Sequence, residues 1–324
     1  MLNLMDVKTP HTLKEAITYF SDPDNCITWM VAKRWPNGVE CPTCGSKKVT
    51  FDAMARRWQC ASHHPKRKFS LKTGTVLEDS PIGLDKWLPV IWLVSNCKNG
   101  VSSWEIHRHM GVTQKTAWFM LQRARLALQG KQGGKLSGEI EADESFIGGK
   151  ARFMHRDKRA EKIHGRGPEG KAIVAAVLER GGEIRAKVVP TRRKKELYQH
   201  VTDNVEKGAE VFTDELLSYD ALNTEFRHQV INHAEEYVSG NVHTNGCENF
   251  WSLFKRGIAG TYVSVEPFHP FRYVDEQAFR YNNRKHVGGE VKTDAERFEI
   301  AVSQIVGKRL TYTELTGHAD DEPF

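Results

Sequence analysis

The chain has 324 residues, of which 39% are hydrophobic and 27% charged, a composition typical of a soluble globular protein with two or three domains. No apolar run reaches 18 residues, and residues 1–6 lack the basic-then-apolar pattern of a signal peptide, so we expect a cytoplasmic protein without a membrane partner. A net charge of +6 and a pI near 8.9 favour a polyanionic partner, although the placement of charge is more informative than its sum.

Residues 1–35 predict an N-terminal helical segment. Leu13, Ile17 and Phe20 are spaced to share one helix face, and Asp22-Pro23-Asp24 interrupts the pattern before a second short helix. We expect this segment to serve packing only.

Residues 36–74 carry the spacing of a zinc ribbon. A Cys-x-x-Cys knuckle is followed by a Cys-x-x-His pair, and tetrahedral zinc sites use thiolate and imidazole ligands at such spacings. The four expected ligands are Cys41, Cys44, Cys60 and His63. His64 is adjacent to His63, so the choice of the fourth ligand stays open between them. Three further cysteines have no partner at metal spacing and are expected to be buried free thiols: Cys26, Cys97 and Cys247.

Basic side chains accumulate around this predicted ribbon, at Lys47-Lys48, at Arg56-Arg57 and at Lys66-Arg67-Lys68. Lysine and arginine are the residues that neutralise DNA phosphates, so the ribbon is a candidate phosphate-binding domain. The alternative is a ribbon that is purely structural or that binds protein.

Residues 80–130 predict three helices, of which the last two have the layout of a helix-turn-helix. A short, serine-capped helix is followed by the turn Gly111-Val112 and by a longer helix. Four side chains at the start of the longer helix would face the DNA major groove: Thr113, Gln114, Lys115 and Trp118. We favour DNA binding because this helix is polar in its first turn and basic further along, at Arg123 and Arg125. The alternative is a plain three-helix packing unit.

Residues 137–290 predict an α/β domain with an RNase H-like mixed sheet flanked by helices. The first strand alternates in polarity, carries Asp143 and stops at Gly148-Gly149, and two further strands continue as a meander. A helix, a fourth strand ending at Asp214, a helical turn, a fifth strand and a late helix complete the order. In the RNase H-like layout the first acid sits on the first strand, the second at the end of the fourth, and the third on the late helix.

Three acids occupy those places: Asp143, Asp214 and Glu248. Together they could bind Mg²⁺, a hard cation that takes a few carboxylate oxygens and keeps positions open for phosphate. Two such ions about 4 Å apart would assist in-line phosphoryl transfer. Lys255 lies about 20° from Glu248 on the helical wheel, opposite the apolar face. The alternative is an ordinary solvated helix face and an exposed strand aspartate, as Glu139 and Glu141 are also expected to be.

Two further segments are charged. Residues 151–171 contain seven Lys or Arg against three acids, which predicts an exposed, mobile loop, and such a loop could also contact nucleic acid. Residues 291–324 predict a C-terminal amphipathic helix followed by a loose acidic tail.

Four blocks resemble, in order, the DDE-superfamily insertion-sequence transposases with an N-terminal zinc ribbon and an RNase H-like catalytic domain, the IS-XO-two-like group. The blocks are 141–150 (EADESFIGGK), 213–219 (TDELLSY), 243–262 (HTNGCENFWSLFKRGIAGTY) and 279–284 (FRYNNR). With the ribbon, the resemblance covers most of residues 36–285.

This resemblance implies a metal-dependent polynucleotidyl transferase that acts in DNA transposition and recombination. It would cut at the terminal inverted repeats of a mobile element and join them to target DNA with Mg²⁺ or Mn²⁺, as a homodimer or larger assembly on the bacterial nucleoid. Asp143 and Asp214 would be metal ligands. The family varies between Glu and Asn at the third position, where Glu248 fits the spacing to Lys255 and Asn245 is the competitor. Lys255 would contact DNA near the scissile phosphate, while His63 departs from the more usual cysteine.

Two other functions are compatible with these residues. One is a DNA-binding regulator whose catalytic domain is inactive, although the presence of all three acids argues against it. The other is a metal-dependent nuclease on the same fold, which would cut DNA without joining it.

Overall fold

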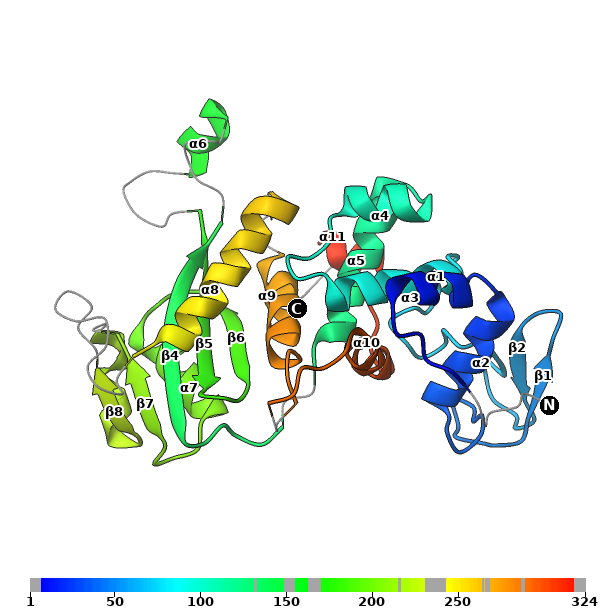
Figure 1. The fold of residues 1–324 in the computed structure, drawn as a ribbon, viewed down its shortest axis with the longest axis horizontal. Helices are drawn as coiled ribbons and strands as arrows, with labels where there is room; N and C mark the ends of the chain where they lie inside the picture. The colour runs from blue at the N-terminus through cyan, green and yellow to red at the C-terminus, as the bar shows by residue number, and fades with distance from the viewer. Residues whose placement is uncertain are drawn as a thin grey trace. The chain divides into compact units, whose positions relative to one another are not determined.

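The computed structural model describes residues 7–130, 133–148, 155–162, 170–214, 217–230, 243–263, 265, 269–286 and 289–317. Internal contacts divide the chain into two compact units (Figure 1). The helical unit comprises residues 1–97, 101–130 and 292–324, and the sheet unit comprises residues 98–100 and 131–291.

The helical unit is built from capped helices around an apolar centre. Its longer helices are α1 (Leu13–Phe20), α2 (Pro23–Arg34), α3 (Leu84–Asn96), α4 (Ser103–Met110), α5 (Gln114–Leu128) and α10 (Asp294–Ser303), and the short α11 (Tyr312–Thr316) follows. The Thr12 hydroxyl accepts the Glu15 amide at the start of α1, and the Asp22 carboxylate accepts the Asp24 amide at the start of α2. These side chains satisfy amides that have no partner within their helices.

Residues from both ends of the chain meet in an aromatic cluster at the centre of this unit. Phe298 of α10 is fully buried, and its ring centroid lies 5.1 Å from that of Trp29 and 5.0 Å from that of Trp92. Phe20 completes the cluster at 5.9 Å. The predicted C-terminal segment 291–324 therefore contributes to the core of the helical unit, and its acidic tail, residues 318–324, lies outside the described residues.

The zinc ribbon within the helical unit is a small antiparallel sheet. Its strands are β1 (Val49–Asp52), β2 (Arg57–Cys60) and β3 (Lys68–Phe69), paired in the order β1-β2-β3. Trp58 stacks on Phe69 with ring centroids 5.9 Å apart, and Trp35 contacts both rings edge-on. This aromatic contact gives the ribbon a core of its own.

The sheet unit has the predicted element order. Its strands are β4 (Glu139–Ile147), β5 (Ala172–Glu179), β6 (Ile184–Val189), β7 (Glu210–Thr213) and β8 (Arg227–Val230). They pair in the order β6-β5-β4-β7-β8, with antiparallel pairing among β4, β5 and β6 and parallel pairing of β7 with β4 and with β8. This five-stranded mixed sheet confirms the predicted RNase H-like fold class.

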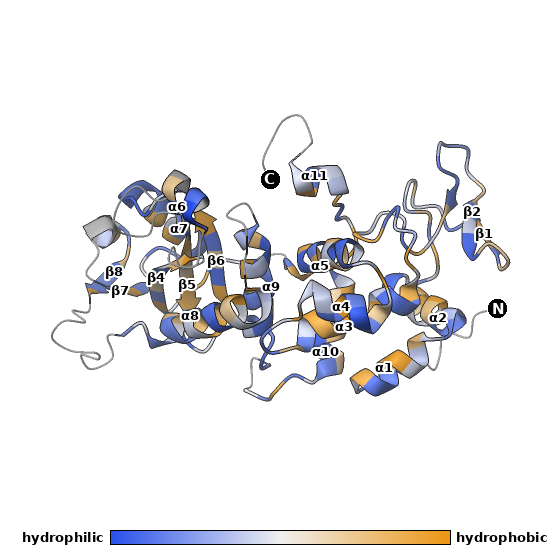
Figure 2. Ribbon diagram, turned by 90° about the horizontal axis from the view of Figure 1, so that it is seen from above, coloured by the Kyte–Doolittle hydropathy of each residue, from blue (hydrophilic) through white to orange (hydrophobic). Residues whose placement is uncertain are grey.

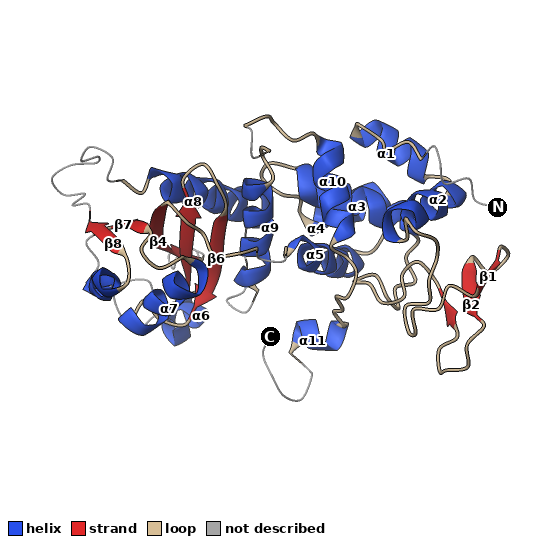
Figure 3. Ribbon diagram, turned by 90° about the horizontal axis from the view of Figure 1, so that it is seen from below, coloured by secondary structure: helices blue, strands red, loops and turns tan. Residues whose placement is uncertain are grey.

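Helices cover both faces of the sheet, as Figure 3 shows. One face packs against α7 (Lys194–Asn204) and η3 (Leu217–Thr224), and the other against α8 (Asn245–Gly257) and α9 (Pro270–Asn282). Alternate residues of β5 point to the two faces, Val177 towards α7 and Leu178 towards α8. Because β5 is buried on both sides, most of its residues are hydrophobic, and Figure 2 draws most of this strand in orange.

Two segments of the sheet unit depart from the predictions. Helix α8 continues into one turn of π-helix, η4 (Ile258–Tyr262), and the charged segment 151–171 contains the helix α6 (Arg156–Lys162). Residues 151–154 and 163–169 of that segment lie outside the described residues, so its predicted contact with nucleic acid stays a prediction. Within the described ranges, no helix is long and apolar enough to cross a membrane.

Candidate functional site

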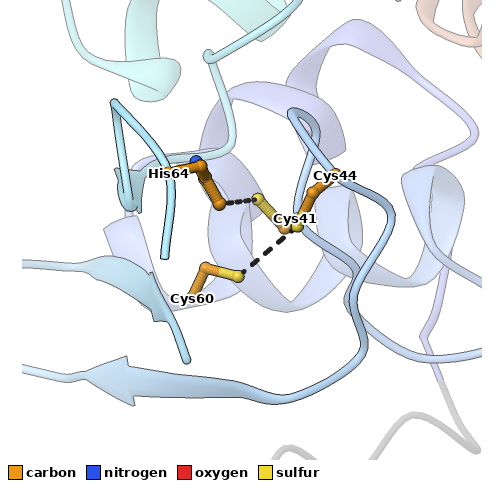
Figure 4. A group of neighbouring side chains, drawn as sticks. All are labelled: Cys41, Cys44, Cys60 and His64. Carbon is orange, nitrogen blue, oxygen red and sulfur yellow. Dashed lines mark hydrogen bonds between the residues drawn. The ribbon is translucent and has the colours of Figure 1, made fainter. Parts of the chain in front are cut away.

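The ribbon brings three cysteines and one histidine together (Figure 4). The ligand atoms of Cys41, Cys44, Cys60 and His64 all lie within 4.8 Å of one another. Cys44 Sγ is 3.7 Å from Cys60 Sγ, and Cys41 Sγ is 3.5 Å from His64 Nε2. In a tetrahedral zinc site two sulfur ligands stand about 3.8 Å apart, and a sulfur and a nitrogen about 3.5 Å. The donor set and its spacing therefore fit a structural Zn²⁺.

The histidine in this group is His64, which corrects the prediction of His63. His64 Nδ1 lies 2.6 Å from the Pro65 carbonyl, which only accepts hydrogen bonds, so Nδ1 carries the proton and Nε2 is free to bind metal. His63 is exposed and lies outside the group. The chain turns directly after β2, and this turn brings His64 rather than His63 to the cysteines. The spacing in the sequence alone does not reveal the turn.

Replacing His64 with alanine is expected to lower the zinc content of the purified protein well below one ion per chain. His63→Ala is the matched control and is expected to keep its zinc, because its ring does not face the cysteines. Metal analysis after dialysis measures both. Zinc loss in His63→Ala with retention in His64→Ala would reverse the assignment.

In the sheet unit, Asp143 lies on β4 and faces α8. Trp251 Nε1 of that helix donates a hydrogen bond of 2.8 Å to Asp143 Oδ2, and the Glu144 amide donates one of 2.8 Å to Oδ1. Burial raises the pKa of Asp143 to about 6; the Trp251 hydrogen bond opposes this shift, and the negative charges of Asp214 and Glu248 add to it. Asp214 and Glu248 thus both lie close enough to Asp143 for their charges to act on it.

These acids come from three elements. Asp143 is in β4, Asp214 directly follows β7, and Glu248 is in the first turn of α8, where it is exposed. Among the described residues only the zinc group has all its ligand atoms within 4.8 Å, so the three carboxylates are more widely spaced.

The other two predicted residues lie on the same helix. Asn245 is the first residue of α8 and Lys255 lies in its last turn, and both side chains are exposed. Neither is buried against the sheet, so both are accessible to a bound polyanion.

The sequence interpretation missed Glu144, which lies beside Asp143 on the opposite face of β4. Its Oε2 accepts a hydrogen bond of 3.0 Å from the hydroxyl of Tyr219, a buried residue of η3. Burial raises the pKa of Glu144 to about 7, and the charge of Asp214 adds to this shift. A fourth carboxylate therefore belongs to the acidic cluster. The alternation of residues along a strand shows only that Glu144 and Asp143 point to opposite faces of β4. It does not show that the Glu144 carboxylate is also shielded from solvent.

The raised pKa values predict that Asp143 and Glu144, without added divalent metal, add to the stability of the sheet unit as the pH falls from about 8 to about 5, whereas His200, whose pKa burial lowers to about 4, subtracts from it as the pH falls below about 6.5. In this window folded Asp143 and Glu144 take up protons that the unfolded chain, with ordinary carboxyl pKa values, does not yet bind, so this stability is lost again as the pH rises through about 6 to 7. We expect these two carboxyls to contribute a gain of a few kcal/mol, or several degrees in melting temperature, by calorimetry of zinc-loaded wild type compared with a variant that lacks them. The double variant Asp143→Asn, Glu144→Gln should lose most of this pH dependence, and an unchanged slope would contradict the prediction.

Helices α4 and α5 form the predicted pair of helices. A capping box of Ser102 and Glu105 starts α4, Gly111 ends it with φ 61°, and the Thr113 hydroxyl caps α5. Thr113 and Lys115 are exposed, and Lys115 Nζ lies 4.5 Å from the Tyr312 ring of α11.

The basic residues further along α5 do not form a DNA-facing surface, contrary to the prediction. Arg123 and Arg125 are buried, and Arg123 donates hydrogen bonds to the Leu310 carbonyl at 3.0 Å and the Glu78 carbonyl at 2.6 Å. Arg123 thereby links α5 to two other segments of the helical unit, and Arg125 is enclosed in its interior. A helix-turn-helix needs the exposed side of its second helix to face DNA. In α5 the start of the helix meets this requirement, and the part that carries Arg123 and Arg125 does not.

A hollow of about 550 Å³ lies beside the zinc group. It is lined by His64, Lys66, Arg67, Lys68, Thr73, Glu78 and Asp79. Lys66 and Lys68 are exposed, whereas Arg67 Nε donates to the Cys60 carbonyl at 3.1 Å. The basic run is therefore partly structural and partly available to an anionic partner.

Comparisons with known proteins agree with this architecture. Residues 135–282 match the model of the ISXO2-like transposase domain, and residues 21–63 match that of the transposase zinc-ribbon domain. The chain is 30% identical over 240 residues to an uncharacterized protein in transposable element ISH50 of Halobacterium salinarum, covering 70% of this chain and 80% of that protein. It is 32% identical over 97 residues to an uncharacterized transposase-like protein of Haemophilus influenzae, covering 30% of this chain and 78% of that protein.

The zinc ribbon, the RNase H-like sheet and these matches place the chain in the class of DNA-processing enzymes. It belongs to the ISXO2-like transposase family. Membership supports a transposase function, and the two matched domains imply binding to DNA.

Proposed function

We propose that the protein cuts the ends of its insertion sequence and joins the freed 3′-hydroxyl to target DNA by two-metal phosphoryl transfer. The observation that carries this proposal is the placement of three carboxylates from separate elements, Asp143 of β4, Asp214 after β7 and Glu248 of α8, with the charges of the last two both raising the pKa of Asp143. Negative charge concentrated at one place favours divalent cations, and carboxylate oxygens are the ligands that Mg²⁺ prefers.

Each residue has a role in this scheme. Asp143, Asp214 and Glu248 would hold Mg²⁺ or Mn²⁺, with Asn245 as the competitor of Glu248. The bound ions would supply Lewis-acid stabilisation of the attacking and leaving oxygens. Trp251 orients Asp143 through its 2.8 Å hydrogen bond, and Lys255, seven residues after Glu248, would contact a backbone phosphate.

The reaction then needs no covalent protein intermediate. A water oxygen attacks phosphorus, the bond from phosphorus to O3′ breaks, and O3′ leaves as a hydroxyl. That hydroxyl attacks a target phosphodiester, forming one phosphorus–oxygen bond as another breaks. No nucleophilic Ser or Tyr is required.

DNA binding is assigned to the helical unit. The start of α5, with its N-cap Thr113 and with Gln114, Lys115 and Trp118, is the candidate for reading bases, as in helix-turn-helix proteins. Exposed Lys66 and Lys68 of the ribbon would contact phosphates. Two element ends must be brought together, so we expect a homodimer or larger assembly on DNA.

A strand-transfer assay tests the proposal. Protein, Mg²⁺, a labelled duplex carrying the element's terminal repeat and a plasmid target are incubated, with Asp214→Asn in parallel. Joined product from the wild type and none from the variant is expected. Salt-sensitive binding with neither cutting nor joining would instead indicate a regulator, and cutting without joining a nuclease.

A further inference from the structure

Glu141 is a buried carboxylate, although the sequence predicts an exposed strand residue. It lies on β4 two residues before Asp143 and is 1% exposed. Its Oε2 accepts hydrogen bonds from the amides of Gly246 at 2.7 Å and Cys247 at 3.0 Å, in the first turn of α8. These amides have no partner within the helix, and the positive end of the helix dipole favours a carboxylate there.

The opposite side of this carboxylate is also paired. Arg180, which follows β5, donates from Nε to Glu141 Oε1 at 3.0 Å. The same guanidinium donates to the His243 carbonyl at 2.8 Å and to Glu139 Oε2 at 3.1 Å. A buried charge is tolerated when it is paired and fully hydrogen-bonded, and Glu141 meets both conditions.

Helix α8 is therefore fixed to β4 at two points. The first is Glu141 with the Gly246 and Cys247 amides, and the second is Asp143 with the Trp251 indole. Two residues along a strand span about 6.7 Å, and the four to five residues from Gly246 or Cys247 to Trp251 span about 6–7.5 Å of helix. The two spacings match, so the register of the helix on the strand is defined. Glu248 lies between the two points.

Gly246 permits this close approach. A Cβ atom at this position would lie 2.5 Å from Leu178 Cδ2 and 2.8 Å from Glu141 Oε2. Both separations are too short for non-bonded heavy atoms, so a side chain here would require the ends of Leu178 and Glu141, or α8 itself, to move from these positions.

We propose that Glu141 is a positioning residue that sets α8 on β4 so that Glu248 stands opposite Asp143. Glu141 acts through the helix and contacts neither DNA nor metal. The inference rests on the proposed function for its effect on catalysis, whereas the anchoring of α8 is testable independently.

The test compares Glu141→Gln with Glu139→Gln. Both substitutions remove a carboxylate that pairs with Arg180, and Glu141 in addition accepts the Gly246 and Cys247 amides of α8, so Glu139→Gln is the matched control. The side-chain amide of Glu141→Gln has only one acceptor oxygen. If this oxygen accepts the α8 amides, the NH₂ group faces the Arg180 donor, so the variant cannot keep both contacts.

For Glu141→Gln we expect faster amide exchange in residues 244–252 with unchanged exchange in β5 and β6. We also expect about 10- to 100-fold slower single-turnover DNA cleavage, with the Kd for terminal DNA within about twofold of wild type.

A second variant approaches the same contact from the helix. Gly246→Ala leaves the carboxylate in place and is expected to give the same pattern of exchange, cleavage and DNA affinity, while Glu139→Gln stays within about twofold of wild type. Wild-type exchange in residues 244–252, or wild-type cleavage, in Glu141→Gln would overturn the inference. If wild-type protein itself neither cuts nor joins DNA, the proposed function fails, and the exchange comparison still decides whether Glu141 anchors α8.

Discussion

Replacing Asp143 with asparagine is expected to lower the rate of DNA-end cleavage by about 10³-fold or more, equivalent to about 4 kcal/mol of transition-state stabilisation. Asparagine has the shape of aspartate, and its amide oxygen can still accept the hydrogen bond from Trp251. The variant loses the charge that a divalent cation requires, and its NH₂ group takes the place of the oxygen that accepts the Glu144 amide. Single-turnover cleavage of a labelled terminal duplex measures the rate.

Two controls separate this effect from unfolding or lost DNA binding. At pH 7.5, without added Mg²⁺, Asp143→Asn is expected to be at least as stable as wild type, because it removes a buried carboxyl whose pKa is raised to about 6. Its affinity for terminal DNA should also be unchanged, because the proposed DNA-reading residues lie on α5. Cleavage within tenfold of wild type would rule out a metal-ligand role for Asp143.

The same assay decides between the two candidates for the third position. Glu248 lies close enough to Asp143 to raise its pKa, so Glu248→Gln should reduce cleavage nearly as much as Asp143→Asn. Asn245 is exposed on the first residue of α8, and Asn245→Ala should have a smaller effect. The reverse ranking would make Asn245 the third catalytic residue.

Replacing Phe298 with alanine is expected to destabilise the helical unit by about 3–5 kcal/mol, the usual cost of deleting a fully buried aromatic ring. Phe298 is stacked against Trp29 and lies within 5.9 Å of the ring of Phe20 and 5.0 Å of that of Trp92. All 8 tryptophans except Trp251 belong to the helical unit, so tryptophan fluorescence during denaturation reports mainly on it.

The matched control is Val306→Ala on the same C-terminal segment. Val306 is 49% exposed, so its truncation should change stability by less than about 0.5 kcal/mol. Equal effects of the two substitutions would show that α10 does not complete the core of this unit.

The sequence predicted features that depend on local patterns. The spacing of Cys41, Cys44 and Cys60 indicated zinc. The polarity periods of strands and helices predicted the order of these elements along the sheet unit, and the fold confirms that order. The predicted layout put Asp143 on the first strand and Asp214 at the end of the fourth, and in the structure these strands, β4 and β7, are parallel neighbours. Their joint role as metal ligands remains a prediction.

Other features depend on contacts between distant residues and could not be read from patterns. His63 and His64 differ by one position, and only the turn after β2 decides which faces the cysteines. Glu141 has the alternation of an exposed strand residue, and the α8 amides that bury it come 105 and 106 residues later. Arg123 is basic in sequence, but the Leu310 carbonyl that it binds comes 187 residues later.

The most direct test of the acidic site is a Mn²⁺ titration of zinc-loaded protein, followed by the electron paramagnetic resonance signal of free Mn²⁺. Asp143, Asp214 and Glu248 are proposed to hold divalent ions, so the wild type should bind Mn²⁺. The double variant Asp143→Asn, Asp214→Asn should not bind it, although its zinc content is unchanged. Equal Mn²⁺ binding by wild type and the double variant, or no binding by wild type, would contradict a catalytic metal site at these acids.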